Sequence, residues 1–450
     1  MRKWLVLILF FAGVSVANAR YVMIADTLQS SAYYPGTKHC MQVSVPEVCD
    51  SSRTVGLYLG LDGILCSAPD VLDTLASQGV IPPMAGVYLQ PGVIEREGTT
   101  LRFNRSNEFD AIDSRFADFL ALEVLPRVDS ILRSDGRGLT ITDNSADRMI
   151  FGLSSGGIAA FVAAWHRPNL FGKVFTGCGT FVPMRGGHNL QAIVRKHEPK
   201  PLRIFMQDGS KDAWNPLFGS WYEANRVLAT ALQFAGYDCG FKWDDSGHSV
   251  RPSAEIFPDV IRWLWRDGSL PLRPGTTSNN YLCDKLPPSD VEGYAWREVD
   301  TLQQTPTGNC EVYYPDSSLM AVVEPGTNFL MQYIVDSDGN RTCGQRYYWL
   351  HTYDNSQLHI ADINFDGDGN LWTLTNAGIQ ICDQNGRVRG ILSLPDGINI
   401  GATTTGRLIL NDGVVVVTVA EKDRQARTFS RKFGVRKAVP GVRPKSQGAA

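Results

Sequence analysis

The stretch RMIFGLSSGGIAA, residues 148–160, decides how the rest of the chain is interpreted. An apolar run leads to a serine with a glycine two positions before it and another two positions after it, and small apolar residues follow. This G-x-S-x-G spacing is typical of a strained strand-to-helix turn that holds a serine hydroxyl clear of a sheet. Glycines avoid Cβ clashes in such a turn, and the helix that follows favours negative charge at its start. Ser154 is therefore a candidate nucleophile, although a plain Gly-Ser turn between a buried strand and a helix has the same pattern.

The first residues are typical of a secretory leader rather than of a folded domain. Arg2 and Lys3 precede an apolar run at 5–14, and Ala-Asn-Ala at 17–19 suits a signal peptidase. We expect residues 1–19 to be removed and the mature chain to be exported, secreted or periplasmic, and soluble. No later stretch is long and apolar enough for a membrane span. A net charge of −3 gives no global attraction to nucleic acid or to an anionic membrane.

Nine cysteines in an exported chain allow disulfides, but the odd number leaves at least one thiol unpaired. Cys40 and Cys49 are close in sequence. The alternating residues between them predict a strand, which would hold their Cα atoms about 30 Å apart, far beyond disulfide reach. We leave the pairing of the cysteines open.

The length of 450 residues suggests two or three domains. In residues 20–268, short apolar strands alternate with segments of helical spacing. The expected strands lie at 41–45, 55–60, 86–90, 173–176, 202–206 and 238–243, and the expected helices at 68–78, 116–125, 221–235 and 256–265. This alternation predicts one α/β domain with a mostly parallel sheet and helices on both faces.

The character of the sequence changes after a linker that we place at residues 269–281, which is rich in proline and polar residues. Short strands then alternate with Gly/Asp/Asn turns at 336–340, 366–370, 383–386 and 411–413. This pattern predicts a smaller all-β domain at 282–421, built like part of a β-propeller or as a small stack of sheets. Residues 422–450 carry nine Lys or Arg, and we expect a flexible basic tail.

An activated serine needs a base and an orienting carboxylate. Histidines follow Ser154 in the α/β domain at 166, 188, 197 and 248. His248 is favoured because it lies in a loop between the expected strand 238–243 and the last helix, where the chain order Ser, acid, His of α/β-hydrolases places the base. His188 lies on a polar loop, where it could contact a substrate.

Two carboxylates compete to orient the histidine. Asp208 directly ends a strand, where it could cap the turn. Asp212 lies three residues beyond a glycine, where the loop can reach a histidine, so Asp212 is favoured and Asp208 remains the alternative. For the oxyanion hole, the amide after the nucleophile, Ser155, is the first expected donor. The second donor is expected from the loop after strand 55–60, around residues 62–64.

Residues from about 30 to 267 resemble the putative-esterase group of α/β-hydrolases, which includes enterochelin esterases, feruloyl esterases, esterase D and mycolyltransferases. The resemblance rests on LDG at 61–63, NEFD at 107–110, FLALEVLP at 119–126, GLSSGG at 152–157, RGGH at 185–188, QDGSKD at 207–212 and SGHS at 246–249. It implies the α/β-hydrolase fold and a Ser154–Asp212–His248 triad that needs no cofactor or metal. Similarity to the mycolyltransferases further suggests the Ile64 amide as the second oxyanion donor.

The second half resembles a fragment of the gluconolactonase/regucalcin propeller family. IADINFDGDGNLW at 360–372 and GIQICDQNGRVRGIL at 378–392 carry this resemblance. Asp362 matches the aspartate of that family's metal site, but the glutamate and asparagine ligands have no convincing match. Because a lone carboxylate rarely holds a metal, we expect this segment to be a binding or packing module.

The sequence thus predicts an exported serine ester hydrolase that works through an acyl-enzyme. Its expected substrate is a small-molecule or saccharide ester: an acylated saccharide, a phenolic ester or a siderophore-type ester. Two other hypotheses stay open, a metal-dependent lactonase in the C-terminal half and a non-catalytic carbohydrate- or siderophore-binding protein on a hydrolase scaffold. Trp214 and Trp221 could stack on a substrate ring or serve as packing. The acyl group, the alcohol and the oligomeric state do not follow from the sequence.

Overall fold

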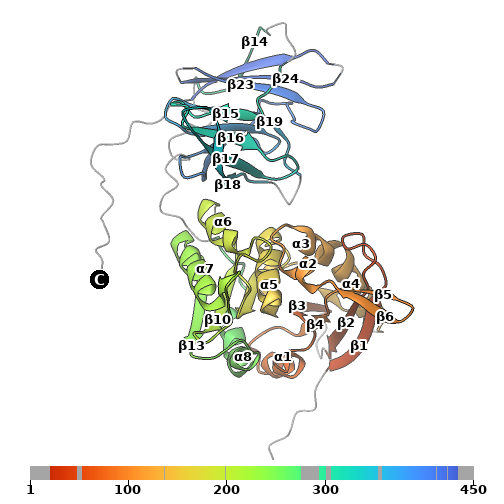
Figure 1. The fold of residues 1–450 in the computed structure, drawn as a ribbon. Helices are drawn as coiled ribbons and strands as arrows, with labels where there is room; N and C mark the ends of the chain where they lie inside the picture. Colours follow the sequence, from red (N-terminus) through yellow and green to blue (C-terminus); the bar gives the residue numbers. More distant parts are fainter. Residues whose placement is uncertain are drawn as a thin grey trace, which may run out of the picture. The chain divides into compact units, whose positions relative to one another are not determined.

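The computed structural model describes residues 21–47, 53–135, 137–197, 199–274, 293–300, 306–352, 357–411, 413–422 and 424–433. The expected leader at 1–19, Cys49 and most of the expected linker lie outside these ranges. The chain divides into two compact units, which are described separately (Figure 1). Unit 1 comprises residues 1–188, 201–226 and 239–273, and unit 2 comprises 189–200, 227–238 and 274–450.

Unit 1 is built on one mixed sheet with the strand order β1-β2-β4-β3-β8-β9-β10-β13, in which β7 also pairs with β3. The central pairs β4–β3, β3–β8, β8–β9 and β9–β10 are parallel, whereas β1–β2 and β2–β4 are antiparallel. The strands are β1 (Tyr21–Leu28), β2 (His39–Pro46), β3 (Thr54–Leu61), β4 (Met84–Leu89), β7 (Thr140–Ile141), β8 (Arg148–Leu153), β9 (Lys173–Gly177), β10 (Arg203–Gly209) and β13 (Asp238–Asp244). The predicted α/β class is confirmed.

Helices cover both faces of this sheet. In Figure 1, α1 and α8 lie on one side and α5 on the other. The helices are α1 (Ala68–Ser77), α2 (Arg105–Phe109), α3 (Arg115–Phe119), a π-helical turn (Leu120–Val124), α4 (Leu125–Ser134), α5 (Ser155–His166) and α8 (Arg251–Leu264). A further helix, α7 (Trp221–Ala235), begins in unit 1, and its residues from 227 onward group with unit 2. Two hairpins project from the domain, β5 (Val93–Arg96) with β6 (Thr99–Phe103), and β11 (Trp214–Asn215) with β12 (Gly219–Ser220).

The core explains why these strands are almost wholly apolar. Every residue of β8 is buried, as expected for a parallel strand covered on both faces. On one face, Phe151 and Phe175 pack against Phe257 of α8 and Leu72 of α1 in a single hydrophobic cluster. α8 begins five residues before the expected helix at 256–265 and carries Pro258 inside it. The sheet is thereby a rigid platform whose strand ends can hold functional loops.

Unit 2 contains α6 (Leu190–Lys196) and three four-stranded antiparallel sheets. The sheets have the orders β15-β16-β17-β18, β19-β20-β21-β22 and β14-β25-β24-β23. Their strands are β14 (Arg297–Val299), β15 (Glu311–Tyr313), β16 (Leu319–Val323), β17 (Phe329–Val335), β18 (Arg341–Trp349), β19 (Ile360–Phe365), β20 (Leu371–Thr375), β21 (Gly378–Cys382), β22 (Val388–Leu392), β23 (Thr405–Asn411), β24 (Val414–Ala420) and β25 (Arg427–Lys432). The expected all-β character is confirmed.

One buried carboxylate joins the three sheets of unit 2. Asp362 is fully buried on β19. Its Oδ1 accepts hydrogen bonds from the amides of Asn309, just before β15, at 2.6 Å and of Ile363 at 2.9 Å. Its Oδ2 accepts from the amide of Leu408 on β23 at 2.6 Å. Both oxygens of the aspartate that was matched to a metal site are therefore occupied by backbone donors.

The expected basic tail is wrong at its start. Residues 427–432 form β25, which pairs with β24 and with β14. Arg427, within the expected tail, makes a two-pronged ion pair with Glu298 of β14, with both N–O distances 2.8 Å. Phe429 is buried in the core of the sheet. Arg427 and Lys432 at the two ends of β25 are exposed, whereas Thr428, Phe429 and Arg431 are buried, so the charged residues conceal a strand.

The extent of the α/β domain also differs from the expected single range. Residues 189–200 and 227–238 lie within the expected 20–268 but group with unit 2. In the part of the chain that the structure describes, no helix has the length and hydropathy needed to cross a bilayer.

Candidate active site

The serine of the G-x-S-x-G motif lies in a strained turn between β8 and α5. Ser154 has φ 57° and ψ −123°, a backbone conformation that L-residues rarely adopt. A Cβ on Gly152 would lie 2.1 Å from the carbonyl oxygen of Gly156, so that position requires glycine. The chain therefore accepts backbone strain at Ser154 in order to present its side chain at the end of the sheet.

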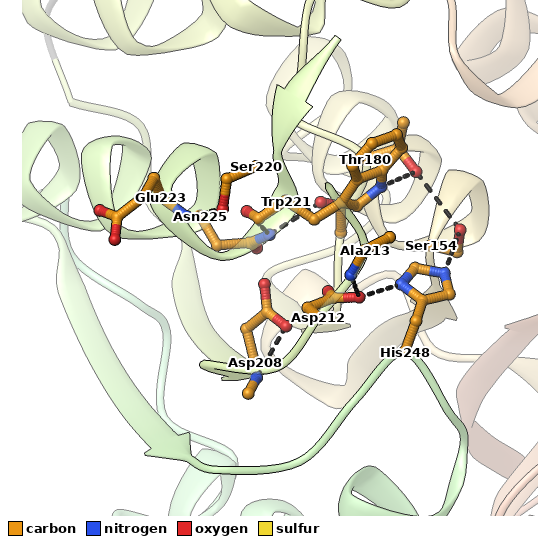
Figure 2. A network of polar contacts seen from close by, with 12 residues as sticks. Ser154, Thr180, Asp208, Asp212, Ala213, Ser220, Trp221, Glu223, Asn225 and His248 are labelled. Atoms are coloured by element: carbon orange, nitrogen blue, oxygen red, sulfur yellow. Dashed lines mark hydrogen bonds and ion pairs between the residues drawn. The ribbon is translucent and has the colours of Figure 1, made fainter. Parts of the chain in front are cut away.

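Three side chains that are far apart in sequence meet at this turn (Figure 2). His248 Nε2 is 2.9 Å from Ser154 Oγ, and His248 Nδ1 is 2.5 Å from Asp212 Oδ1. With its proton on Nδ1, the ring donates to the carboxylate and accepts from the serine hydroxyl. The Asp212 side chain is fully buried, whereas 34% of the His248 side chain is exposed. The structure thus brings together the three residues expected to form a triad.

The two competing carboxylates have different surroundings. Asp212 contacts His248, whereas Asp208 accepts a hydrogen bond from the Gly209 amide at 2.7 Å. Burial acts to raise the pKa of Asp212, but hydrogen bonds with His248 and Asp208 outweigh it and lower that pKa. Burial, a hydrogen bond to Asp212 and the charge of Asp212 raise the pKa of Asp208 from 3.8 to about 9. At neutral pH, Asp208 is therefore a neutral acid beside the Asp212 carboxylate, an arrangement typical of two carboxyl groups that share one proton.

The loops that carry the acid and the histidine are tied to each other. The Ser210 amide, just after β10, donates to the carbonyl of Asp244, the last residue of β13, at 2.8 Å. A Cβ on Gly209 would lie 2.2 Å from the carbonyl oxygen of Ser246, so glycine is needed where the loops touch. Because β8 and β10 are both parallel neighbours of β9, the ends of β8 and β10 lie at the same edge of the sheet. The sheet therefore fixes the spacing of the three side chains.

The two expected oxyanion donors lie on loops at this same edge. Ser155 is the first residue of α5, so its amide has no acceptor within that helix. Ile64 follows β3, which runs parallel to β8, and 41% of it is exposed. Among the described residues, neither amide donates to a backbone carbonyl.

An ion pair that the sequence did not reveal joins the Ile64 loop to the serine turn. Arg105, at the start of α2, makes two hydrogen bonds of 2.7 Å to the Asp62 carboxylate. The same guanidinium donates to the carbonyl of Leu153, directly before Ser154, at 3.3 Å. Asp62 belongs to the LDG motif, but its partner lies 43 residues away, and only the folded chain brings them together. This contact holds the backbone on which both candidate oxyanion donors depend.

The other three candidate histidines are placed elsewhere. His166 is hydrogen-bonded to the carbonyl of Ile112 at 2.9 Å, and His197 to the carbonyl of Ile193 at 3.0 Å. His188 is exposed and lies in a short 3₁₀ turn. Among the described residues, His248 is the only histidine that is hydrogen-bonded to Ser154.

A possible metal-ligand group coincides with this site. The Cys178 sulfur and one ligand atom each of Asp212 and His248 lie within 4.8 Å of one another. Burial and the charges of Asp212 and Asp208 raise the pKa of the Cys178 thiol to about 12, which opposes the thiolate that a metal requires. The hydrogen bonds of Asp212 and His248 also serve Ser154. These residues therefore do not fit a resident metal.

Comparison with known proteins bears on the same residues. Residues 32–252 match the putative esterase family. This range is just under half of the chain and includes Ser154, Asp212 and His248. It supports an ester hydrolase for the part of the chain that it covers. No curated protein sequence matches the chain.

Several solved esterase structures are similar to this chain. A ferulic acid esterase is 17% identical, with a TM-score of 0.43, and the match covers 55% of this chain and 99% of that one. An enterobactin esterase from Shigella flexneri is 21% identical, with a TM-score of 0.42, over 55% of this chain and 60% of that one. An enterobactin and salmochelin hydrolase is 17% identical, with a TM-score of 0.39, over 55% and 96%. This chain therefore spans less than two thirds of the Shigella enzyme.

Proposed function

We propose that this chain is a serine ester hydrolase in which Ser154 is the nucleophile, His248 the general base and Asp212 the carboxylate that orients the histidine. The observation that carries the proposal is the unbroken set of hydrogen bonds from Ser154 Oγ through His248 to Asp212 Oδ1. The strained backbone of Ser154 is a second support, because such strain is characteristic of serine nucleophiles on strand-to-helix turns.

In the proposed acyl transfer, each of these residues has a defined role. His248 Nε2 takes the proton of Ser154 as the oxygen bonds to the ester carbonyl carbon, and the carbonyl electrons move onto its oxygen. Asp212 holds the ring in position and stabilises the imidazolium. The amides of Ser155 and Ile64 donate to the oxyanion. Collapse expels the alcohol, which takes the proton from His248, and a water then cleaves the acyl-enzyme through the same base.

We propose that the substrate is an acylated saccharide, a phenolic ester or a siderophore-type ester. The support comes from the family match and from the apolar surface of the β11–β12 hairpin, which begins two residues after Asp212. Trp214 and Leu217 on this hairpin are 70% and 81% exposed, an unusual arrangement for large apolar side chains without a partner. Trp221, the other tryptophan considered from the sequence, is buried.

Export of the chain and a role for unit 2 are part of the same proposal. The leader pattern at residues 1–19 supports export to a secreted or periplasmic location. We propose that unit 2 serves as a binding or packing module. A lactonase in unit 2 is not proposed, because both oxygens of Asp362 accept hydrogen bonds from backbone amides.

Hydrolysis of p-nitrophenyl acetate tests the proposal. We expect Ser154→Ala and His248→Ala to lose at least about 1000-fold in kcat/KM. Ser77 is an exposed serine whose hydroxyl donates to the Thr74 carbonyl, and Ser77→Ala should match the parent. A metal-dependent lactonase would instead lose activity with a chelator and keep it in Ser154→Ala. A binding protein without catalysis would show no turnover and no labelling by a fluorophosphonate.

A further inference from the structure

A second polar chain reaches Ser154 from Thr180, in the loop after β9. Thr180 is only 1% exposed. Its amide donates to the Ser154 carbonyl at 3.0 Å, and its Oγ1 lies 3.4 Å from Ser154 Oγ. Figure 2 shows Ser154 between the Thr180 hydroxyl and the His248 ring. The serine oxygen therefore has two side-chain partners, of which the triad uses one.

The direction of this second chain is fixed by a tryptophan. Trp221 Nε1 is 3.2 Å from Thr180 Oγ1. An indole N–H can only donate, so the threonine oxygen is the acceptor. The hydroxyl proton of Thr180 is then free to point at Ser154 Oγ. Ser154 in turn donates its own proton to His248, so each hydroxyl in the series accepts one hydrogen bond and donates the next.

The indole itself is held firmly. The Trp221 amide donates to the carbonyl of Ala213, the residue after Asp212, at 3.1 Å. Asn225, which is fully buried one turn later on α7, donates to the Trp221 carbonyl at 3.0 Å and to the Gly179 carbonyl at 2.8 Å. The side chain of Asn225 thus ties the start of α7 to the loop that carries Thr180. The position of the indole N–H is set by these backbone contacts.

We propose that the Thr180 hydroxyl, oriented by Trp221, is a further catalytic group that stabilises the negative charge on Ser154 Oγ as its proton moves to His248. The inference rests on the proposed function. Thr180 keeps its proton throughout, and its hydrogen bond strengthens only while the serine oxygen carries charge, both when the serine attacks and when it is expelled from the acyl-enzyme. A contact of 3.4 Å is long in the resting state, which leaves room for it to tighten in the transition state.

The rate of labelling by a fluorophosphonate isolates this effect, because the reaction needs the serine nucleophile but no acyl pocket. Thr180→Val, which keeps the shape and removes the hydroxyl, should label about tenfold more slowly, as expected for loss of one hydrogen bond to a charged group. Thr180→Ser, which restores a hydroxyl, should label within about threefold of the parent. Trp221→Phe should fall between these two variants. With p-nitrophenyl acetate, Thr180→Val should lower kcat and leave KM unchanged.

Thr176→Val is the matched control. Thr176 on β9 is also fully buried, and its hydroxyl has no hydrogen-bond partner in the structure, so its removal should not change the labelling rate. Equal labelling of Thr180→Val and the parent would overturn the inference, as would a Thr180→Ser variant as slow as Thr180→Val. If the parent is not labelled at Ser154 at all, the proposed function fails instead, so the two failures can be told apart.

Discussion

Asparagine at position 208 should leave ester hydrolysis near its parent rate at pH 7, whereas asparagine at position 212 should nearly abolish it. Because its pKa is raised to about 9, Asp208 is mostly protonated at pH 7. Asparagine therefore replaces a neutral carboxylic acid with a neutral amide that can still accept from the Gly209 amide and donate to Asp212. We expect kcat/KM of Asp208→Asn to stay within about threefold of the parent.

The same change at Asp212 removes a charge that the site uses. The Asp212 carboxylate is fully buried and lies 2.5 Å from His248 Nδ1. Asparagine there offers an amide, which favours the wrong tautomer of the ring and cannot stabilise the imidazolium. We expect kcat to fall by about 10⁴-fold, the loss typical of this substitution in serine hydrolases.

The alkaline range separates the two carboxyl groups further. Above pH 9 the parent gains a second buried negative charge at Asp208, which Asp208→Asn cannot gain, so only the parent should change in kcat/KM near that pH. In the unfolded chain Asp208 releases its proton near its ordinary pKa of 3.8, but the folded chain retains it up to about 9. The free energy of unfolding of the parent should therefore fall relative to that of Asp208→Asn as the pH rises between these values.

The assay is kcat/KM for a phenyl ester from pH 6 to 10, corrected for spontaneous hydrolysis, together with urea unfolding of each variant. An Asp208→Asn variant that loses as much activity as Asp212→Asn would refute the assignment of the two carboxyls. So would an Asp212→Asn variant that retains most of its activity.

Three further predictions follow from the packing. Gly152→Ala places a Cβ 2.1 Å from the Gly156 carbonyl oxygen, so urea unfolding should show a loss of about 2–3 kcal/mol and labelling at Ser154 should slow strongly; parent-like values would contradict the account of the turn. The ammonium group of Lys173 lies against the face of the Trp265 ring, and burial lowers its pKa from 10.5 to about 7. Between these two pH values the unfolded chain therefore binds more protons than the folded chain. The free energy of unfolding of Lys173→Met minus that of the parent should therefore be largest below pH 7 and about 4 kcal/mol smaller at pH 10.5. A difference that does not change with pH would refute this prediction. Asp362→Ala leaves three backbone amides without their acceptor and should destabilise unit 2 by about 3–5 kcal/mol, measured as its unfolding transition, with ester hydrolysis retained.

Local patterns in the sequence are enough to locate most central strands of the α/β sheet, the serine turn and the histidine loop. The G-x-S-x-G spacing is a backbone requirement, which the contact between Gly152 and Gly156 makes explicit. His248 could be singled out because its loop lies between the last strand and the last helix of the α/β domain. The sequence favours Asp212 but leaves Asp208 open, since Asp208 lies at the end of β10, Asp212 lies just after it, and the answer depends on side-chain direction.

Other features depend on contacts between distant segments, for which the sequence carries no local signal. The Arg105–Asp62 ion pair and the approach of Thr180 to Ser154 span 43 and 26 residues. β25 was missed for a different reason. Three of its six residues are charged, Arg431 among them is buried, and Arg427 pairs with Glu298, so no alternation of apolar and polar residues marks the strand.

The most direct test of the central claim is to trap the acyl-enzyme and find the residue that carries the acyl group. The parent would be mixed with p-nitrophenyl acetate, quenched with acid within the first turnover and digested for mass spectrometry. We predict an acetyl group on Ser154 in the parent and none in His248→Ala treated in the same way. Turnover by the parent with acetyl on a different residue, or equal acetylation of Ser154 without His248, would contradict the account.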